Sequence, residues 1–69
     1  MSKEEKQIEG LMYQYVTNTD KETRIKIFHT LMAYDDKGIH AINELIKVTR
    51  SDELIVYALG LIKKPSEPF

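Results

Sequence analysis

Three side chains in this sequence have a spacing that could bind a metal ion. Asp36, His40 and Glu44 follow one another at intervals of four residues, so a helix would place them on one side. Carboxylate and imidazole groups both coordinate divalent cations. The same spacing is also typical of a solvated helix face, where charges on successive turns pair weakly. We favour the solvated face, and we therefore expect no metal site and no cofactor.

The remaining residues give no indication of catalysis. His29 has no carboxylate or nucleophile at a suggestive spacing, so we expect it at the surface or at the edge of the core. A catalytic serine needs an adjacent base, but the serines here fall at predicted helix starts or in the C-terminal tail: Ser2, Ser51 and Ser66. The glycines are isolated from one another, which excludes a glycine-rich phosphate loop. We therefore predict that the protein is not an enzyme.

The charge balance gives little support to nucleic-acid binding. Lys and Arg number 10 against 11 for Asp and Glu, a formal net charge of −1, whereas nucleic-acid-binding proteins usually carry a basic excess. A small regulator with a helix-turn-helix in residues 20–50 is the alternative that we keep open. Its second helix would contain Glu44, which opposes binding to phosphates. The basic residues of these two helices are Lys21, Arg24, Lys26, Lys37, Lys47 and Arg50.

Length and composition indicate one small domain. A chain of 69 residues has room for a single domain, which we place at residues 1–64, followed by a flexible tail at residues 65–69. Such a chain buries only about 60% of its unfolded surface, and the absence of Cys excludes both disulfides and thiolate zinc sites. Stability must then come from tight helix packing or from self-association.

The sequence contains no segment that would direct it into a membrane. Its first residues, MSKEEKQIEG, are charged where a signal peptide would need an apolar core. No run approaches the roughly 20 apolar residues of a membrane span. We therefore expect a soluble, cytoplasmic protein.

Apolar residues with a helical period predict three helices between Ser2 and Thr49. Capping boxes are predicted at Ser2–Glu5 and at Thr19–Glu22, with Asn18 at the end of the first helix. A turn is predicted at residues 35–38, with Asp35 or Asp36 capping the third helix. The expected apolar stripes are Ile8, Leu11, Met12, Tyr15 and Val16; Ile25, Ile27, Phe28, Leu31, Met32 and Tyr34; and Ile39, Ala41, Ile42, Leu45, Ile46, Val48 and Thr49.

The last apolar segment, residues 54–62, is compatible with either a buried helix or a buried strand. The chain offers no second strand for it to pair with, and an isolated strand leaves its backbone hydrogen bonds unsatisfied. Ser51 is a good N-cap, and Lys63 and Lys64 suit the C-terminus of a helix. We therefore predict a fourth helix.

The central stretch resembles a HEAT-like repeat of the kind found in phycobilin-lyase-type proteins. Thr23-Arg24 occupies the position of the family's hydrophobic-Arg pair, and Leu31 that of its closing Leu. The turn then corresponds to residues 34–36 and the second helix to residues 38–46. The sequence departs from the pattern because Thr23 is polar and because bulky residues, Ile27 and Phe28, replace small ones. The resemblance implies one repeat flanked by two half-repeats, an interaction scaffold and no catalytic residue.

These observations predict an all-α fold of four short antiparallel helices. The helices would form either HEAT-like helical hairpins or a compact four-helix bundle. Arg24 would either form an inter-helix ion pair with Asp20 or Asp35, as the resemblance suggests, or lie exposed.

The fourth helix is the strongest candidate for a contact surface. If Leu54, Ala58 and Leu61 face the third helix, other apolar residues point outward. The alternative is that a closed bundle buries them, and that Tyr13 packs against a neighbouring side chain. We predict a non-enzymatic helical protein–protein interaction module, an adaptor or regulator, that self-associates through its last helix. The expected partner or homodimer interface comprises Ile55, Val56, Leu59, Ile62 and Tyr13.

Overall fold

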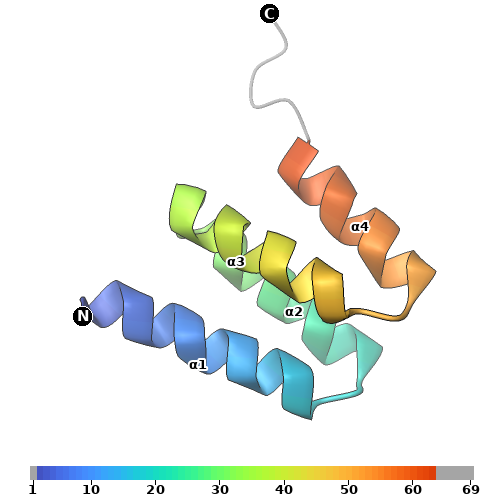
Figure 1. Cartoon of the computed structure of the whole chain (residues 1–69), viewed down its shortest axis with the longest axis horizontal. Helices are drawn as coiled ribbons and strands as arrows, with labels where there is room; N and C mark the ends of the chain where they lie inside the picture. The colour runs from blue at the N-terminus through green and yellow to red at the C-terminus, as the bar shows by residue number, and fades with distance from the viewer. Residues whose placement is uncertain (1, 64–69) are drawn as a thin grey trace, which may run out of the picture.

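The computed structural model describes residues 2–63, and the regular structure in this part of the chain is entirely helical. The helices are α1 (Lys3–Thr17), α2 (Lys21–Met32), α3 (Asp35–Val48) and α4 (Asp52–Lys63) (Figure 1). The prediction of an all-α fold with four short helices is confirmed, and the apolar final segment is a helix. The tail predicted at residues 65–69 lies outside the described residues.

The first two helices begin at side-chain caps. Ser2 and Glu5 form the predicted capping box of α1: the Glu5 amide donates to the Ser2 hydroxyl at 3.1 Å, and the Ser2 amide to the Glu5 carboxylate at 3.3 Å. For α2 the prediction was one residue early. The N-cap is Asp20 and not Thr19, because the Asp20 carboxylate accepts both the amide and the hydroxyl of Thr23, at 3.0 and 2.7 Å.

The connection between α2 and α3 differs from the prediction. The turn lies at residues 33–34, and the predicted turn at residues 35–38 is the first turn of α3. Neither Asp35 nor Asp36 caps this helix, because its N-cap residue is Tyr34, which makes no side-chain capping bond. Asp35 instead adopts the left-handed conformation, with φ of 58°, which lets the chain reverse within two residues. Both carboxylates still lie in the first turn, where they suit the helix dipole.

Gly38 allows this short connection because α2 and α3 approach closely there. A Cβ atom at this position would overlap the carbonyl oxygen of Leu31 and lie 3.2 Å from the Cβ of Tyr34. Gly10 and Gly60 have open space around the same position. Gly38 is therefore needed for close packing between the two helices, and the other two glycines are not.

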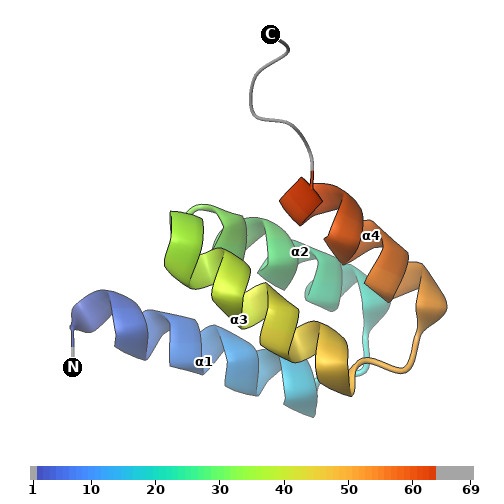
Figure 2. The ribbon, with the colours of Figure 1, turned by 45° about the horizontal axis from the view of Figure 1, so that its top comes forward.

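The helices form two layers rather than a closed bundle. α1 and α3 run in the same direction side by side, and α2 and α4 pack behind and beside them (Figures 1 and 2). α2 and α3 each contact all the other helices, whereas α1 and α4 do not contact one another. The thinnest dimension, 18 Å, fits two helices packed 8–10 Å apart. A closed bundle would pack its first helix against its last, so the layout favours the helical-hairpin alternative.

The core lies between the two layers and draws on all four helices. Most of the predicted apolar residues contribute to it, but Val16 and Val48 remain 52% and 61% exposed. They lie at the C-terminal ends of α1 and α3, on the sides that no further helix covers within residues 2–63. The buried apolar residues are Ile8, Tyr15, Ile27, Phe28, Leu31, Ala41, Ile42, Leu45, Leu54 and Ala58.

Tyr15 joins three helices at one end of the core. Its ring contacts the ring of Phe28 at a centroid distance of 5.1 Å. Its hydroxyl lies 2.5 Å from the hydroxyl of Thr49. Because Thr49 donates its only hydroxyl proton to the carbonyl of Leu45 at 2.8 Å, Tyr15 must donate in the shorter bond. This bond fixes the C-terminal end of α1 beside the C-terminal end of α3.

Arg24 takes neither of its two predicted roles. Its Nε donates to the backbone carbonyls of Asn18 and Tyr15, at 2.7 and 3.2 Å, and its guanidinium lies 4.4 Å from the centre of the Tyr15 ring. The last turn of α1 contains no basic residue of its own. The last carbonyls of a helix lack intrahelical partners and attract cations, so Arg24 of the next helix satisfies them.

Candidate interaction surfaces

The outward side of α4 carries apolar side chains that the fold leaves accessible. Val56 is 69% exposed, Ile55 and Leu59 are half-buried, and Ile62 packs partly against the core. We call these four residues the α4 face. Leu54 and Ala58 point the other way and are buried, as predicted. α4 therefore has apolar residues on two sides. The side with Leu54 and Ala58 is buried in the core, and the α4 face is not covered by another helix within residues 2–63.

Opposite charges lie at the two ends of the α4 face. Asp52, Val56, Leu59 and Lys63 follow one another at i, i+4, i+7 and i+11, which forms one stripe along the helix. Asp52 and Lys63 are exposed, and among residues 2–63 neither forms an ion pair. Glu53, by contrast, pairs with Lys21 of α2 at 2.5 Å.

Tyr13 is 69% exposed on α1, so the alternative of packing against a neighbouring side chain is wrong. α1 and α4 do not contact one another. The structure therefore does not bring Tyr13 together with Ile55, Val56, Leu59 and Ile62, and a single interface through α4 alone does not include it.

A second surface is a groove of about 850 Å³ between α1 and α3. Its apolar part is formed by Ile8, Met12 and Ala41. Ile8 and Ala41 are buried, and Met12 is the most accessible of the three. Figure 2 shows α1 and α3 running in the same direction. The residues that line the groove lie between Glu5 and Met12 on α1 and between Asp36 and Glu44 on α3.

The rim of the groove is acidic. Four carboxylates line it, from Glu5, Glu9, Asp36 and Glu44, together with one lysine and His40. With His40 neutral these residues carry a formal charge of −3, against −1 for the whole chain. The negative charge of the protein is therefore concentrated here, and the rest of the chain is slightly basic.

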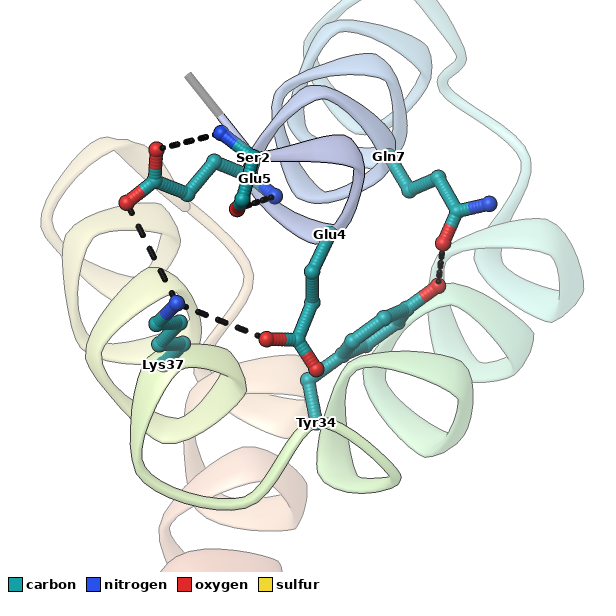
Figure 3. Close-up of polar contacts among 6 residues, drawn as sticks. All are labelled: Ser2, Glu4, Glu5, Gln7, Tyr34 and Lys37. Carbon is teal, nitrogen blue, oxygen red and sulfur yellow. Dashed lines mark hydrogen bonds and ion pairs between the residues drawn. The ribbon is translucent and has the colours of Figure 1, made fainter.

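The N-terminal end of the groove is held together by polar contacts (Figure 3). Lys37 lies between Glu4 and Glu5, with its Nζ 3.4 and 4.0 Å from their carboxylates. The hydroxyl of Tyr34 donates to the side-chain carbonyl of Gln7 at 2.8 Å. These contacts are exposed and each contributes little stability, but they fix the spacing of the two helices where the groove begins.

The predicted metal-ligand candidates Asp36, His40 and Glu44 all line this groove. Among residues 2–63, no group of three or more His, Cys, Asp or Glu side chains is arranged to hold a metal ion. The helix-turn-helix alternative also gains no support from this surface. α3 would be its recognition helix, and the carboxylates that α3 presents here would repel phosphates.

His29 lies at the surface, as predicted, and contacts an aromatic residue of α4. Its Nε2 is 2.5 Å from the hydroxyl of Tyr57, and the two rings meet edge to face with centroids 5.7 Å apart. Tyr57 is 39% exposed. The pair joins α2 to α4 on the flank of α4 away from Leu59, so Tyr57 is accounted for within the fold.

The α1 side of the groove was not predicted from the sequence. Glu5, Glu9 and Met12 have the spacing i, i+4 and i+7, which resembles that of Asp36, His40 and Glu44 on α3. This pattern was visible in the sequence. Its meaning depends on α1 and α3 being parallel neighbours, which follows from the tertiary arrangement alone.

None of the helices within residues 2–63 is long and apolar enough to cross a lipid bilayer.

In comparisons with known proteins, no family model, no curated protein and no solved structure matches this chain. The HEAT-like resemblance therefore stays a prediction.

Proposed function

We propose that the protein is a non-enzymatic helical interaction module that forms a homodimer through the α4 face. The observation that carries the proposal is the apolar stripe of α4, with Val56 exposed and Leu59 half-buried, which has an acid at one end and a base at the other. An adaptor or regulator needs no catalytic residue, and the proposal assigns none. Cytoplasmic localisation stays a prediction from the composition.

A second copy of the chain is a suitable occupant because the α4 face carries no charge of its own. Two such faces can meet without repulsion between like charges. The groove between α1 and α3, with its formal charge of −3, would repel a second groove. A short chain with a small core also gains stability when a partner covers its exposed apolar surface.

The charges at the ends of the stripe specify how two copies would pair. In a two-fold antiparallel arrangement of the α4 helices, Asp52 of one copy lies opposite the second copy's Lys63. The same symmetry places Val56 opposite the second copy's Leu59. Each dimer then has an apolar centre with an ion pair at either end. A parallel arrangement would instead place like charges together at both ends.

The expected dimer is weak. A helix of 12 residues is about 18 Å long, so two α4 helices bury an area at the low end of specific interfaces, below about 1,200 Å². We therefore expect a dissociation constant in the micromolar range, with a favourable free energy of about 8 kcal/mol.

Sedimentation velocity across the micromolar range tests this proposal. We expect a concentration-dependent dimer in the wild type and a monomer in Leu59→Lys, because this substitution places a charge in the apolar centre. Tyr13→Lys is the matched control. It introduces the same charge at an exposed residue of α1, and we expect it to dimerise like the wild type.

A charge swap tests the antiparallel pairing. Asp52→Lys and Lys63→Asp should each weaken the dimer by about tenfold, because each replaces two attractions by two repulsions. The double variant should restore dimerisation, because the charges are then exchanged but still complementary. A wild-type chain that stays monomeric over the micromolar range would contradict self-association. Failure of the double variant to recover would contradict this pairing.

A further inference from the structure

We infer that the groove between α1 and α3 is a docking site for a basic amphipathic helix of a partner protein. The inference rests on the proposed role as an interaction module, but it concerns a different surface from the α4 face. The groove is formed by α1 and α3, and α1 does not contact α4, so the two surfaces share no residue.

The charge of the groove selects a cationic partner. Lys37 is already engaged by Glu4 and Glu5, and Glu44 is paired with Lys47 at 3.2 Å. Within residues 2–63, Glu9 and Asp36 form no ion pair. Their carboxylates are therefore free to pair with Lys or Arg side chains from outside.

Apolar side chains continue the groove beyond its acidic part. Val16 follows Met12 by four residues on α1, and Val48 follows Glu44 by four residues on α3, so each lies on the groove side of its helix. The bond between Tyr15 and Thr49 holds the adjacent residues of the two helices together. Val16 and Val48 are 52% and 61% exposed, which places an uncovered apolar end beside the acidic rim.

A groove with an acidic rim and an apolar end is complementary to an amphipathic basic helix, more than to an extended or purely basic segment. A helix laid along the groove would direct its apolar residues at Met12, Val16 and Val48. Its basic residues would flank this stripe and reach Glu9 and Asp36 from above the rim. Helices commonly dock in this way, with anchors at i, i+3, i+4 and i+7. Two parallel helices offer a groove of the right shape for a third.

The probe for this inference is a synthetic helical peptide with Leu at i, i+3, i+4 and i+7 and Lys at its other positions. The control peptide replaces every Lys by Glu. Binding is followed by the chemical shifts of backbone amides, with the monomeric Leu59→Lys protein so that self-association does not interfere. We expect the Lys peptide to shift residues of α1 and α3 around Met12 and Ala41, and the Glu peptide to bind more weakly. Binding should also weaken with added salt, because the contacts are exposed.

A pair of matched variants locates the charge contact. Glu9→Lys should weaken binding of the Lys peptide roughly fivefold or more, whereas Glu22→Lys, an equal change at an exposed residue of α2, should leave it unchanged. The inference is overturned if the Lys peptide does not bind, if it shifts the residues of α4 instead, if the Glu peptide binds equally well, or if Glu9→Lys has no effect. A wild-type chain without a dimer leaves these outcomes unaffected, so the two proposals fail separately.

Discussion

The packing of α2 against α3 leaves no space for a side chain at position 38, which Gly38 occupies. A Cβ atom there would overlap the carbonyl oxygen of Leu31. Because a backbone atom has no alternative rotamer, the two helices would have to separate. We expect Gly38→Ala to lower the free energy of unfolding by about 3 kcal/mol, measured by urea denaturation followed by circular dichroism.

Gly10→Ala is the matched control for this prediction. Gly10 lies within α1 and has open space around the position of a Cβ atom. Alanine is the better helix former, so this variant should be more stable by about 0.5–1 kcal/mol. Equal effects of the two substitutions would show that helix propensity, and not the approach of α2 to α3, decides the outcome at Gly38.

At the scale of the elements, the N-terminus of α2 gives a prediction for pH. Bonds from the Thr23 hydroxyl, and then from the Thr23 amide, lower the pKa of Asp20 below its ordinary value of 3.8. A lowered pKa means that the folded state binds the proton less tightly than the unfolded state. The contribution of Asp20 to stability is therefore complete above pH 3.8 and is lost as pH falls through the lower folded value.

Asp20→Asn tests this contribution, because Asn also caps helices but does not titrate. The stability of the wild type should fall more steeply than that of Asp20→Asn as pH is lowered below about 4. Thermal unfolding at a series of pH values measures the difference. Parallel pH profiles for the two proteins would refute a role for the Asp20 charge. Asp36→Asn is a control, because Asp36 accepts no capping bond.

The elements were largely predictable from the sequence, and their ends less so. Helical periodicity and the cap at Ser2 were enough to place α1. The absence of a partner strand, the cap at Ser51 and the two lysines that follow residue 62 together identified α4 as a helix. The turn before α3 was misplaced because Asp and Gly residues favour turns, whereas Gly38 is present for close packing. The role of Arg24 was not among the two alternatives, an ion pair or an exposed side chain, because the sequence does not show that the carbonyls at the end of α1 lie within its reach.

The two surfaces were predictable to different degrees because one belongs to a single helix and the other depends on how two helices pack. The α4 face follows from an unbroken apolar run, residues 54–62, because a helix of this composition is apolar on all sides. The groove depends on α1 and α3 lying side by side although α2 separates them in the chain. Val16 and Val48 were expected in the core because they continue apolar stripes, but the core includes only other residues of these stripes. The exposure of the two valines results from the open layout, in which no further described helix packs over α1 and α3.

At the scale of the whole molecule, the open layout makes the helices unequal in stability. α2 and α3 contact every other helix, whereas α1 and α4 contact only these two. α4 buries only Leu54 and Ala58, whereas α3 buries Gly38, Ala41, Ile42 and Leu45. Local opening costs less where fewer contacts are lost. The central hairpin of α2 and α3 should therefore be the last part to open.

Amide hydrogen exchange tests both this order and the proposed dimer. In dilute solution we expect the slowest exchange in α2 and α3 and clearly faster exchange in α4. Raising the protein concentration through the micromolar range should slow exchange in α4 more than in α1, because association stabilises the helix that it covers. The monomeric Leu59→Lys variant should show no such dependence on concentration. Slowing of equal size in α1 and α4 would point to association through another surface, and the assignment of the interface to Val56 and Leu59 would then be wrong.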